Sequence, residues 1–575
     1  MIKLYRYLDK FTSQIVAIIV LIFLQVIANL YLPTLSSDII DKGIVNNDLN
    51  YIIRIGGLML LISAGGVICS VVAGFLASRT AVALGMIIRS KIFAKVENFS
   101  LDEFDKLGTA TLITRTTNDV TQVQQVTVMM FSIMLLAPLT GIGGIIMALK
   151  EDKPLTWIFV VVIPLLSIII GMVLKKGLPL FKLMQVKLDK LNLVLREGLT
   201  GIRVIRAFNR IEREKERFGL ANYDLMDNSV KVNIIMAVLM PVMMLIMNLT
   251  TVAIFWFGSM RIDAGSMEVG SLMAFIQYGM QILFAFLMVA MMFIMIPRAQ
   301  ASAVRINEVL EMEPEIVDLE NTKMADKQSG YVEFKDVTFS YQGAEQPALC
   351  NITFKANPGE ITAIIGGTGS GKSTLVNLIP RFYDVHSGSV LVNGVDVREI
   401  SQKDLRSKIG YVPQKNVLFS GTIAENIKYG NDSATLDQIQ HAADVAQATE
   451  FITGMDMGFD HFIAQGGTNV SGGQKQRLSI ARALIRRPEI YIFDDSFSAL
   501  DFKTDARLRA ALKKETAMAT VIIIAQRVAT VMDADRIIVL DEGQISGMGT
   551  HKDLLVSCKV YHEIVSSQLS EEELE

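Results

Sequence analysis

A glycine-rich run with one lysine is the first group of residues in this sequence that could do chemistry. The run consists of Gly366, Gly367, Thr368, Gly369, Ser370, Gly371, Lys372, Ser373 and Thr374. Closely spaced glycines let backbone N–H groups turn inward around phosphate oxygens, and the Lys372 ammonium can neutralise a β- or γ-phosphate. The Ser373 hydroxyl is a suitable Mg²⁺ ligand. The run therefore predicts a phosphate-binding loop with a magnesium ion.

Two further groups of residues could take part in similar chemistry. Asp494 directly follows the apolar run Ile490–Phe493. A carboxylate at a strand tip beside a phosphate-binding loop can hold Mg²⁺ through water. The second group is Ser471, Gly472, Gly473 and Gln474, which precede an apolar helical stretch. A hydroxyl and backbone N–H groups at a helix N-terminus form an arrangement that binds anions.

Short elements must position these residues, and the flanking sequence predicts them. Thr362–Ile365 is short and rich in β-branched residues, as a buried strand is. The glycine-rich run follows at once, and an apolar helical stretch begins at Leu375. Strand, glycine-rich loop and helix together are the context that a P-loop requires. We therefore expect an α/β domain from Tyr331 onwards.

The residues before Arg298 have a different character. Of the 575 residues, 51% are hydrophobic and 20% are charged. Windows without Asp, Glu, Lys or Arg are long enough to cross a bilayer, which takes about 20 apolar residues, only in this first half. They are 11–37, 55–78, 120–149, 154–174, 232–260 and 269–297. The sequence predicts six membrane spans followed by a domain outside the bilayer.

Basic residues gather in alternate connections between these windows. Segment 175–231 is rich in Lys and Arg, whereas the preceding connection is only Lys150–Lys153. The positive-inside rule then places both termini and the connections 79–119 and 175–231 in the cytosol. We expect a multi-pass protein of the plasma membrane, whose helices continue through these long connections. The N-terminus is basic and is followed by a long apolar run without a signal-peptide cleavage site. This pattern predicts that the first helix is retained in the mature protein.

Uncharged polar residues and methionines are the candidate substrate ligands within the spans. Methionine is flexible and polarizable, which suits a surface that repacks around varied apolar molecules. The candidates for a cavity are Met244, Asn248, Gln277, Gln281 and Met288. Two other interpretations stay open, because polar side chains also bond across helix contacts and methionine also faces lipid.

Several classes of function are disfavoured by the composition. A net charge of −3 offers no general field for nucleic acid. The three cysteines are far apart, which favours neither a disulfide framework nor a metal site.

In this order, the motifs of the second half resemble the nucleotide-binding domain of an ATP-binding cassette transporter. The resemblance implies that Ser471–Gln474 is the signature that contacts the γ-phosphate of ATP held by the opposite subunit. It also implies an adenine-stacking ring at Tyr341, a Q-loop residue that senses Mg²⁺ at Gln414, and a D-loop from Ser498 to Asp501. ATP and Mg²⁺ are the implied cofactors.

The first half is similar to exporters in which six spans are fused to one cassette. Thr111–Asp119 and Gly201–Phe208 carry this similarity. The expected fold is therefore a membrane α-helical domain with long cytosolic extensions, joined to a P-loop α/β domain. The expected boundaries are 1–310 for the transmembrane domain, 311–330 for an acidic linker, 331–568 for the cassette and 569–575 for an acidic tail.

The chain departs from the family pattern at positions that matter for hydrolysis. Asp495 stands where active cassettes carry Glu, and Gln526 stands where they carry a switch His. A third departure is Gln465, where related exporters often carry Glu. Asp is one methylene shorter than Glu, and Gln cannot be protonated near neutral pH. Tolerated drift in an active enzyme is the alternative explanation.

A degenerate catalytic strand beside an intact signature resembles one subunit of a heterodimeric exporter. The resemblance implies that this P-loop holds ATP at a weak site. The signature would complete the active site of a homologous half-transporter with Glu and His at the matching positions. Hydrophobic or multidrug substrates are expected. A lipid or peptide exporter, and a membrane-anchored ATP sensor without transport, are the alternatives.

Overall fold

A computed structural model describes residues 1–323 and 330–568. The expected linker 311–330 lies partly, and the expected tail 569–575 wholly, outside the described residues. The contacts divide the chain into two compact units. The membrane unit comprises Met1–Glu97 and Ala110–Met312, and the nucleotide unit comprises Asn98–Thr109 and Glu313–Glu575.

The prediction of six membrane spans is confirmed. Six helical segments among the described residues are long and apolar enough to cross a membrane: Ile2–Ile44, Leu49–Val96, Thr109–Glu151, Trp157–Thr200, Ile211–Asp263 and Val269–Val289. The longest has 53 residues. At about 1.5 Å per residue it is roughly 80 Å long, against about 30 Å of hydrocarbon. The helices therefore continue far beyond the apolar windows, as expected for the long connections.

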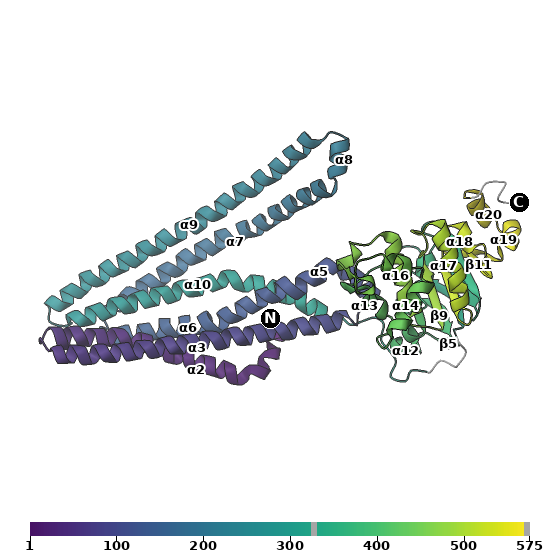
Figure 1. Cartoon of the computed structure of the whole chain (residues 1–575). Coiled ribbons are helices and arrows are strands. Elements are labelled where there is room, and N and C mark those ends of the chain that lie inside the picture. Colours follow the sequence, from purple (N-terminus) through teal and green to yellow (C-terminus); the bar gives the residue numbers. More distant parts are fainter. Residues whose placement is uncertain (324–329, 569–575) are drawn as a thin grey trace. The chain divides into compact units, whose positions relative to one another are not determined.

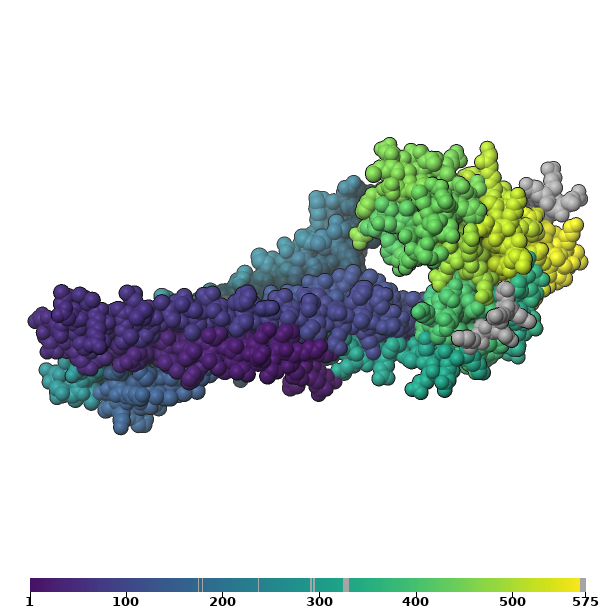
Figure 2. All heavy atoms as spheres, turned by 60° about the horizontal axis from the view of Figure 1, so that its bottom comes forward, coloured from purple at the N-terminus to yellow at the C-terminus, as the bar shows by residue number. Residues whose placement is uncertain are grey.

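All regular secondary structure among the described residues of the membrane unit is helical. Their bounds are α1 (Ile2–Tyr5), η1 (Arg6–Phe11), α2 (Thr12–Asp38), η2 (Ile39–Ile44), α3 (Leu49–Val96), α5 (Thr109–Thr114), η3 (Arg115–Asp119), α6 (Val120–Glu151), α7 (Trp157–Thr200), α8 (Ile202–Ala207), α9 (Ile211–Asp263) and α10 (Val269–Glu311). Helices α2, α3, α6 and α10 pack against one another, whereas α7 and α9 pack mainly on each other and are joined through α8 (Figure 1). Figure 2 shows the N-terminal side chains, in purple, packed along the blue helices that follow them.

A few buried polar contacts fix the register of the membrane helices. The Tyr278 hydroxyl on α10 donates to the Leu30 carbonyl on α2 at 3.0 Å and lies 2.7 Å from the Thr34 hydroxyl. Arg261 on α9 donates to the buried carboxylate of Asp152 at 2.7 Å. An unpaired polar group inside a membrane costs several kcal/mol, roughly, so these pairs favour one helix arrangement.

The nucleotide unit contains two main sheets. The first has the order β2-β1-β4-β5 and the second the order β12-β11-β3-β10-β9-β6, while β7 and β8 form a separate pair. The strands are β1 (Val332–Phe339), β2 (Leu349–Ala356), β3 (Ile361–Gly366), β4 (Ser387–Val392), β5 (Val395–Asp396), β6 (Ile409–Val412), β7 (Gly421–Thr422), β8 (Phe462–Ile463), β9 (Ile490–Asp494), β10 (Thr520–Ile524), β11 (Arg536–Asp541) and β12 (Gln544–Gly549). Only β12 runs antiparallel in the second sheet.

Helices cover the second sheet, whose alternate side chains enter two cores. Val521 and Ile523 of β10 belong to one buried cluster, and Ile522 and Ile524 belong to the other. The helices of the nucleotide unit are α4 (Leu101–Leu107), α11 (Lys372–Asn377), α12 (Gln402–Ser407), α13 (Ile423–Lys428), α14 (Leu436–Val445), α15 (Thr449–Thr453), η4 (Gly458–Asp460), η5 (Gln465–Gly467), α16 (Gly472–Leu484), α17 (Phe502–Glu515), α18 (Val528–Val531), α19 (His551–Ser557) and α20 (Lys559–Ser566).

The parallel strands bring the expected motifs to one edge of the second sheet. Strands β3, β10, β9 and β6 are neighbours in this order and run in the same direction. Their carboxyl ends therefore lie side by side, as at the ligand edge of other open α/β sheets. The glycine-rich run begins at the last residue of β3, and Gln526 follows β10. Asp494 ends β9, Asp495 follows it, and Gln414 follows β6.

Candidate functional site

The glycine-rich run forms a tight turn between β3 and α11. Gly369 and Gly371 have φ angles of +84° and +95°, which only glycine adopts without strain. A Cβ on Gly371 would lie 2.8 Å from the Ala348 carbonyl oxygen, so a side chain does not fit there. Successive glycines thus leave the backbone N–H groups of the loop open to an anion.

The Lys372 ammonium lies inside this loop. It donates to the carbonyls of Gly366 and Gly367 at 2.9 and 2.6 Å. Burial lowers the pKa of this ammonium, and the charges of Asp495 and Asp494 oppose that shift. The ammonium also donates to the Ser370 hydroxyl at 3.4 Å. A buried cation held by neutral oxygens is well placed to meet a phosphate, which would supply a full negative charge.

Ser373 and Asp494 are adjacent, as magnesium binding requires. The Ser373 hydroxyl donates to Asp494 Oδ1 at 3.0 Å. Burial raises the pKa of Asp494, and this hydrogen bond opposes the effect. Both are hard oxygen donors, and Mg²⁺ needs only one or two protein oxygens when phosphates and waters complete its shell. The residues present therefore fit this ion.

Asp495 and Gln526 occupy the position beside the P-loop where hydrolytic chemistry would be expected. Gln526 Nε2 donates to Asp495 Oδ2 at 3.2 Å. Burial raises the pKa of Asp495, and a hydrogen bond from Gln414 opposes the shift. Asp495 has a φ of +48°, a left-handed conformation that Asp adopts more readily than most residues. The carboxylate is thus held by two amides.

The signature residues begin a long helix. Ser471 is the N-cap of α16: its hydroxyl accepts the Gln474 N–H at 3.3 Å, and Gln474 Oε1 accepts the Ser471 N–H at 2.8 Å. Ser471 and Gly472 are exposed. No hydrogen bond joins Ser471–Gln474 to the P-loop within the part of the chain that the structure describes.

The signature is instead tied to the D-loop, through a residue that sequence reasoning missed. Buried Gln476 accepts the Ala499 N–H at 3.1 Å, and its Nε2 donates to the Ser498 hydroxyl at 3.4 Å. The Ser498 hydroxyl in turn donates to the Asp495 carbonyl at 3.0 Å. Signature, D-loop and Asp495 form one connected segment of hydrogen bonds.

The other expected site residues lie at its margin. The Tyr341 hydroxyl is 2.9 Å from the Thr374 hydroxyl, and the ring is partly exposed, edge-on to Tyr383. Asp501 caps α17 by accepting the Thr504 N–H at 2.9 Å. Gln465 lies exposed in η5.

Gln568 contacts the switch segment from the C-terminal side, and no sequence motif indicated it. Its Oε1 accepts the Val528 N–H and its Nε2 donates to the Gln526 carbonyl, both at 2.8 Å. Between these two residues, Arg527 donates to the Ser498 carbonyl at 3.1 Å. One side chain after α20 therefore holds both backbone positions that flank Arg527.

Replacing Gln568 by Ala is expected to loosen the switch segment. The Val528 N–H, which is buried with its side chain, would lose its acceptor. Each lost backbone contact is worth about 1 kcal/mol, so amide exchange in 526–531 should accelerate by roughly 5- to 30-fold. Hydrogen-exchange mass spectrometry measures this change. Ser567→Ala, whose hydroxyl makes only a local bond to Ile564, is the control. Equal exchange in both variants would contradict the assignment.

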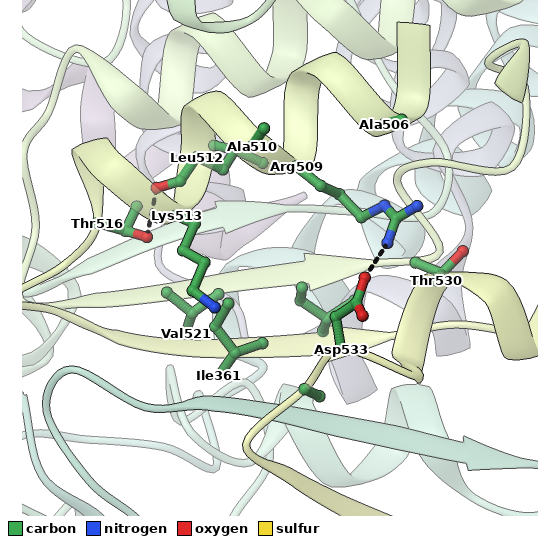
Figure 3. A pocket seen from close by; sticks show the side chains of 12 residues that line it. Ile361, Ala506, Arg509, Ala510, Leu512, Lys513, Thr516, Val521, Thr530 and Asp533 are labelled. Atoms are coloured by element: carbon green, nitrogen blue, oxygen red, sulfur yellow. Dashed lines mark hydrogen bonds and ion pairs between the residues drawn. The ribbon is translucent and has the colours of Figure 1, made fainter. Parts of the chain in front are cut away.

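A hollow of about 380 Å³ elsewhere in the nucleotide unit contains none of the motif residues. Figure 3 shows that Arg509 reaches across it to Asp533, while Lys513 points over Val521 and Ile361. Its walls come from α17, β10 and the segment after α18. The nucleotide motifs and this hollow are therefore separate features.

The candidate cavity residues of the membrane unit fall into two groups. Gln277, Gln281 and Met288 line a hollow of about 370 Å³ between α2, α6 and α10. Met244 and Asn248 lie exposed on α9 and do not line it. The structure thus brings the three α10 residues together with Asn29, another of the polar residues within the spans.

Comparisons with known families cover both units. The family model "ABC transporter transmembrane region" matches residues 15–287, and the model "ABC transporter" matches residues 349–498.

Individual relatives extend over almost the whole chain. An uncharacterized ABC transporter ATP-binding protein of Mycobacterium tuberculosis is 42% identical over 98% of this chain and 97% of its own length. A fatty acid ABC transporter ATP-binding/permease protein of Mycobacterium tuberculosis is 33% identical over 83% of this chain and 75% of its own length. The solved structure of a bacterial Atm1-family ABC exporter with ATP bound matches with a TM-score of 0.82 and 24% identity, covering 97% of this chain and 99% of that one.

Proposed function

This chain belongs to the ABC transporter family as an exporter half-transporter, an ATP-hydrolysing membrane protein, and we propose that it acts as one subunit of a heterodimer. Its own P-loop would form the degenerate ATP site, and its signature would complete the active site on the partner's P-loop. The assembly would move hydrophobic or multidrug substrates out of the cytoplasm. The observation that carries the proposal is the contact between Asp495 and Gln526 at the catalytic edge.

The geometry of this contact argues against efficient hydrolysis at the chain's own site. Asp495 ends one methylene short of Glu, which withdraws its carboxylate by roughly 1.5 Å, and a misplacement of about 1 Å can cost a hundredfold in rate. A general base must reach the attacking water. Here the carboxylate is engaged by the Gln526 amide instead, which cannot gain a proton near neutral pH.

The signature, in contrast, is ordered by hydrogen bonds. The capping box of Ser471 and Gln474 orders the first turn of α16, and Gln476 anchors that turn to the D-loop. The exposed Ser471 hydroxyl and the helix N-terminus together suit the γ-phosphate of an ATP molecule on another chain. This combination supports a partner that carries Glu and His at the positions of Asp495 and Gln526.

The membrane unit also supports a second subunit. Helix α8, which joins α7 and α9, has no buried residue. Its apolar side chains Ile202 and Val204, and Phe208 just after it, are exposed. Apolar residues gathered at the end of a long hairpin favour burial against another chain.

The proposed mechanism is alternating access. Lys372 and the P-loop amides would bind the phosphates, and Ser373 and Asp494 would hold a magnesium ion, which would supply positive charge to the phosphates. Gln414, beside Asp495, would report the state of the site to the membrane helices. Closure of two cassettes would then reshape the cavity between the spans. The basic connections support a plasma-membrane location with both termini in the cytoplasm.

Lipid export is the second candidate for the substrate. It is favoured by the similarity to a fatty acid transporter and by the methionines that line the α10 hollow. Peptide export and a membrane-anchored ATP sensor remain as further alternatives, which differ in what moves across the membrane.

The heterodimer proposal is tested by ATP turnover with and without a partner. We expect the purified chain to hydrolyse ATP slowly, and a homologous half-transporter from the same organism, with Glu and His at the matching positions, to raise turnover by about 100-fold. Inverted vesicles that contain both chains should then take up a lipophilic dye in the presence of ATP. Robust, cooperative hydrolysis by the chain alone would refute the heterodimer, and ATP binding without any uptake would favour the sensor.

A further inference from the structure

The hollow between α2, α6 and α10 has the size and walls of a ligand pocket. Its volume of about 370 Å³ lies within the range of roughly 300–1,000 Å³ found for small-molecule sites. Apolar side chains form most of its wall: Leu32, Leu136, Met280, Phe284 and Met288. Two methionines and a phenylalanine suit an apolar body of variable shape.

Three amide side chains lie in the same wall, from two different helices. Asn29 belongs to α2, and Gln277 and Gln281 belong to α10, one turn apart. Gln281 Oε1 is buried without a hydrogen-bond partner, and its Nε2 reaches the Asn29 carbonyl only at 3.4 Å. Asn29 and Gln277 are exposed, and no hydrogen bond is found for their side-chain amides among the described residues.

The buried and unpaired side-chain oxygen of Gln281 needs an explanation at membrane depth. An unsatisfied polar group there costs several kcal/mol, roughly, because no lipid tail can hydrogen-bond to it. The cost is recovered when a ligand supplies the missing donors and acceptors, and an amide can provide both. The arrangement therefore fits a molecule whose head group forms several hydrogen bonds.

The pocket carries no charge. None of the residues that line it is Asp, Glu, Lys, Arg or His. A cation bound here would lose its hydration without gaining a counter-ion, which strongly disfavours the charged state. A hydroxyl, an amide or a protonated carboxyl loses much less hydration and pairs well with the amides.

A second hollow on the same helices lacks these amides. It measures about 520 Å³, lies between α2 and α6, and is lined only by apolar residues: Ile19, Val20, Phe23, Leu24, Met134, Leu135, Pro138 and Leu139. Such a surface suits lipid tails. The polar groups are thus placed in one of two neighbouring hollows and are not a general property of these helices.

We propose that the amide-lined pocket binds uncharged amphiphiles, molecules with an apolar body and a hydrogen-bonding head, in preference to lipophilic cations. This inference rests on the proposed export function, because the pocket is taken as the place where the transported molecule binds. Gln277 and Gln281 would select the head group, and Met280, Phe284 and Met288 would contact the body.

The test uses the full chain with its partner in inverted membrane vesicles and two amphiphilic or apolar probes that differ in charge. Radiolabelled 1-octanoylglycerol is uncharged with two hydroxyls, and tetraphenylphosphonium is a lipophilic cation. ATP-dependent uptake and equilibrium binding in detergent are both measured. The main variant is Gln277→Met with Gln281→Met, which keeps side-chain volume but removes both amides. Phe23→Leu in the apolar hollow is the matched control.

We expect the double variant to raise the half-saturating concentration of 1-octanoylglycerol by roughly 10-fold or more, while the control and tetraphenylphosphonium change less than about 2-fold. Gln277→Glu should increase tetraphenylphosphonium uptake, because it adds the missing counter-charge. An unchanged 1-octanoylglycerol affinity in the double variant would overturn the inference.

The outcomes separate this inference from the export function. Uptake of tetraphenylphosphonium but not 1-octanoylglycerol by the wild type leaves export intact and refutes the uncharged ligand. If neither probe is taken up, export of these classes is contradicted. In that case, binding of 1-octanoylglycerol to the wild type in detergent that is lost in the double variant still supports the pocket. If the wild type does not bind 1-octanoylglycerol in detergent, the proposed pocket is refuted.

Discussion

Exchanging Asp495 for Glu and Gln526 for His in the same chain is expected to raise ATP hydrolysis by the purified chain about 10- to 100-fold. Two copies of this chain can supply intact signatures to each other, because Ser471–Gln474 is ordered and exposed. What they lack is the base and the switch residue. Glu extends the carboxylate by roughly a bond length toward the water, and His adds a group that can carry charge near the γ-phosphate.

The two exchanges should act together. Gln526 Nε2 donates a hydrogen bond to Asp495 Oδ2 at 3.2 Å in the wild type. A glutamate carboxylate beside an unchanged Gln526 would therefore still accept a hydrogen bond from that amide. Residues in direct contact give non-additive effects, and each single exchange should recover only a small part of the gain. Phosphate release at saturating ATP measures the rates.

Asp495→Asn is the control for this repair, since it removes charge without adding reach and should give no gain. Asp495 has a φ of +48°, so Glu introduces some backbone strain there, and thermal unfolding of each variant must be compared. A folded double variant with the slow rate of the wild type would show that the chemistry is limited elsewhere. High turnover by the wild type would show that Asp495 is an adequate base.

The local context explains which parts of the nucleotide site could be predicted. A strand, a glycine-rich loop and a helix are contiguous in sequence, so the P-loop was recognisable from residues 362–375 alone. Asp494 could be added because it ends a strand rich in β-branched and aromatic residues, whereas Gln526 was identified only through the resemblance to the cassette family. The parallel order of β3, β10 and β9 then accounts for their meeting at one edge.

Residues that act through tertiary packing carried no such signal. Gln476 and Gln568 are single polar residues on or after amphipathic helices, and their roles depend on loops that are distant in sequence. The position of α4, which lies in sequence between two apolar helices, also depends on segments that are distant in sequence. Leu101 packs into a core of the nucleotide unit, and Glu103 accepts the Glu315 N–H at 3.0 Å.

The membrane pocket shows a different limit of prediction from sequence. Polar residues and methionines within spans can be read from the sequence, but the neighbours of each span cannot. Helix α10 packs on α2 and α6, which brings Gln277 and Gln281 to Asn29. Helix α9 packs mainly on α7, so Met244 and Asn248 lie apart from that pocket.

Ser471→Ala is expected to lower ATP turnover in the assembled exporter, whereas Lys372→Ala is expected mainly to shorten ATP retention. Removal of the Ser471 hydroxyl takes a donor from the partner's γ-phosphate, and loss of such a donor lowers turnover by roughly 100- to 1,000-fold. Lys372 lies in the degenerate site, so its loss should lower turnover less than about 3-fold. The lost charge contact, about 1.5–3 kcal/mol, should shorten ATP retention by roughly 10- to 100-fold. Steady-state phosphate release and the dissociation rate of a fluorescent ATP analogue measure the two effects.

Ser471 also caps α16, so a matched capping variant is needed. Thr435 and Gln438 form the same capping box on α14, with the Thr435 N–H donating to Gln438 Oε1 at 2.9 Å. Thr435→Ala should therefore cost a similar stability of about 1 kcal/mol without the loss of turnover. If Lys372→Ala lowers turnover more than Ser471→Ala does, the chain's own P-loop is the main hydrolytic site. The assignment of Asp495 and Gln526 to a degenerate site then fails, because a site that holds ATP without hydrolysing it cannot limit turnover through its lysine.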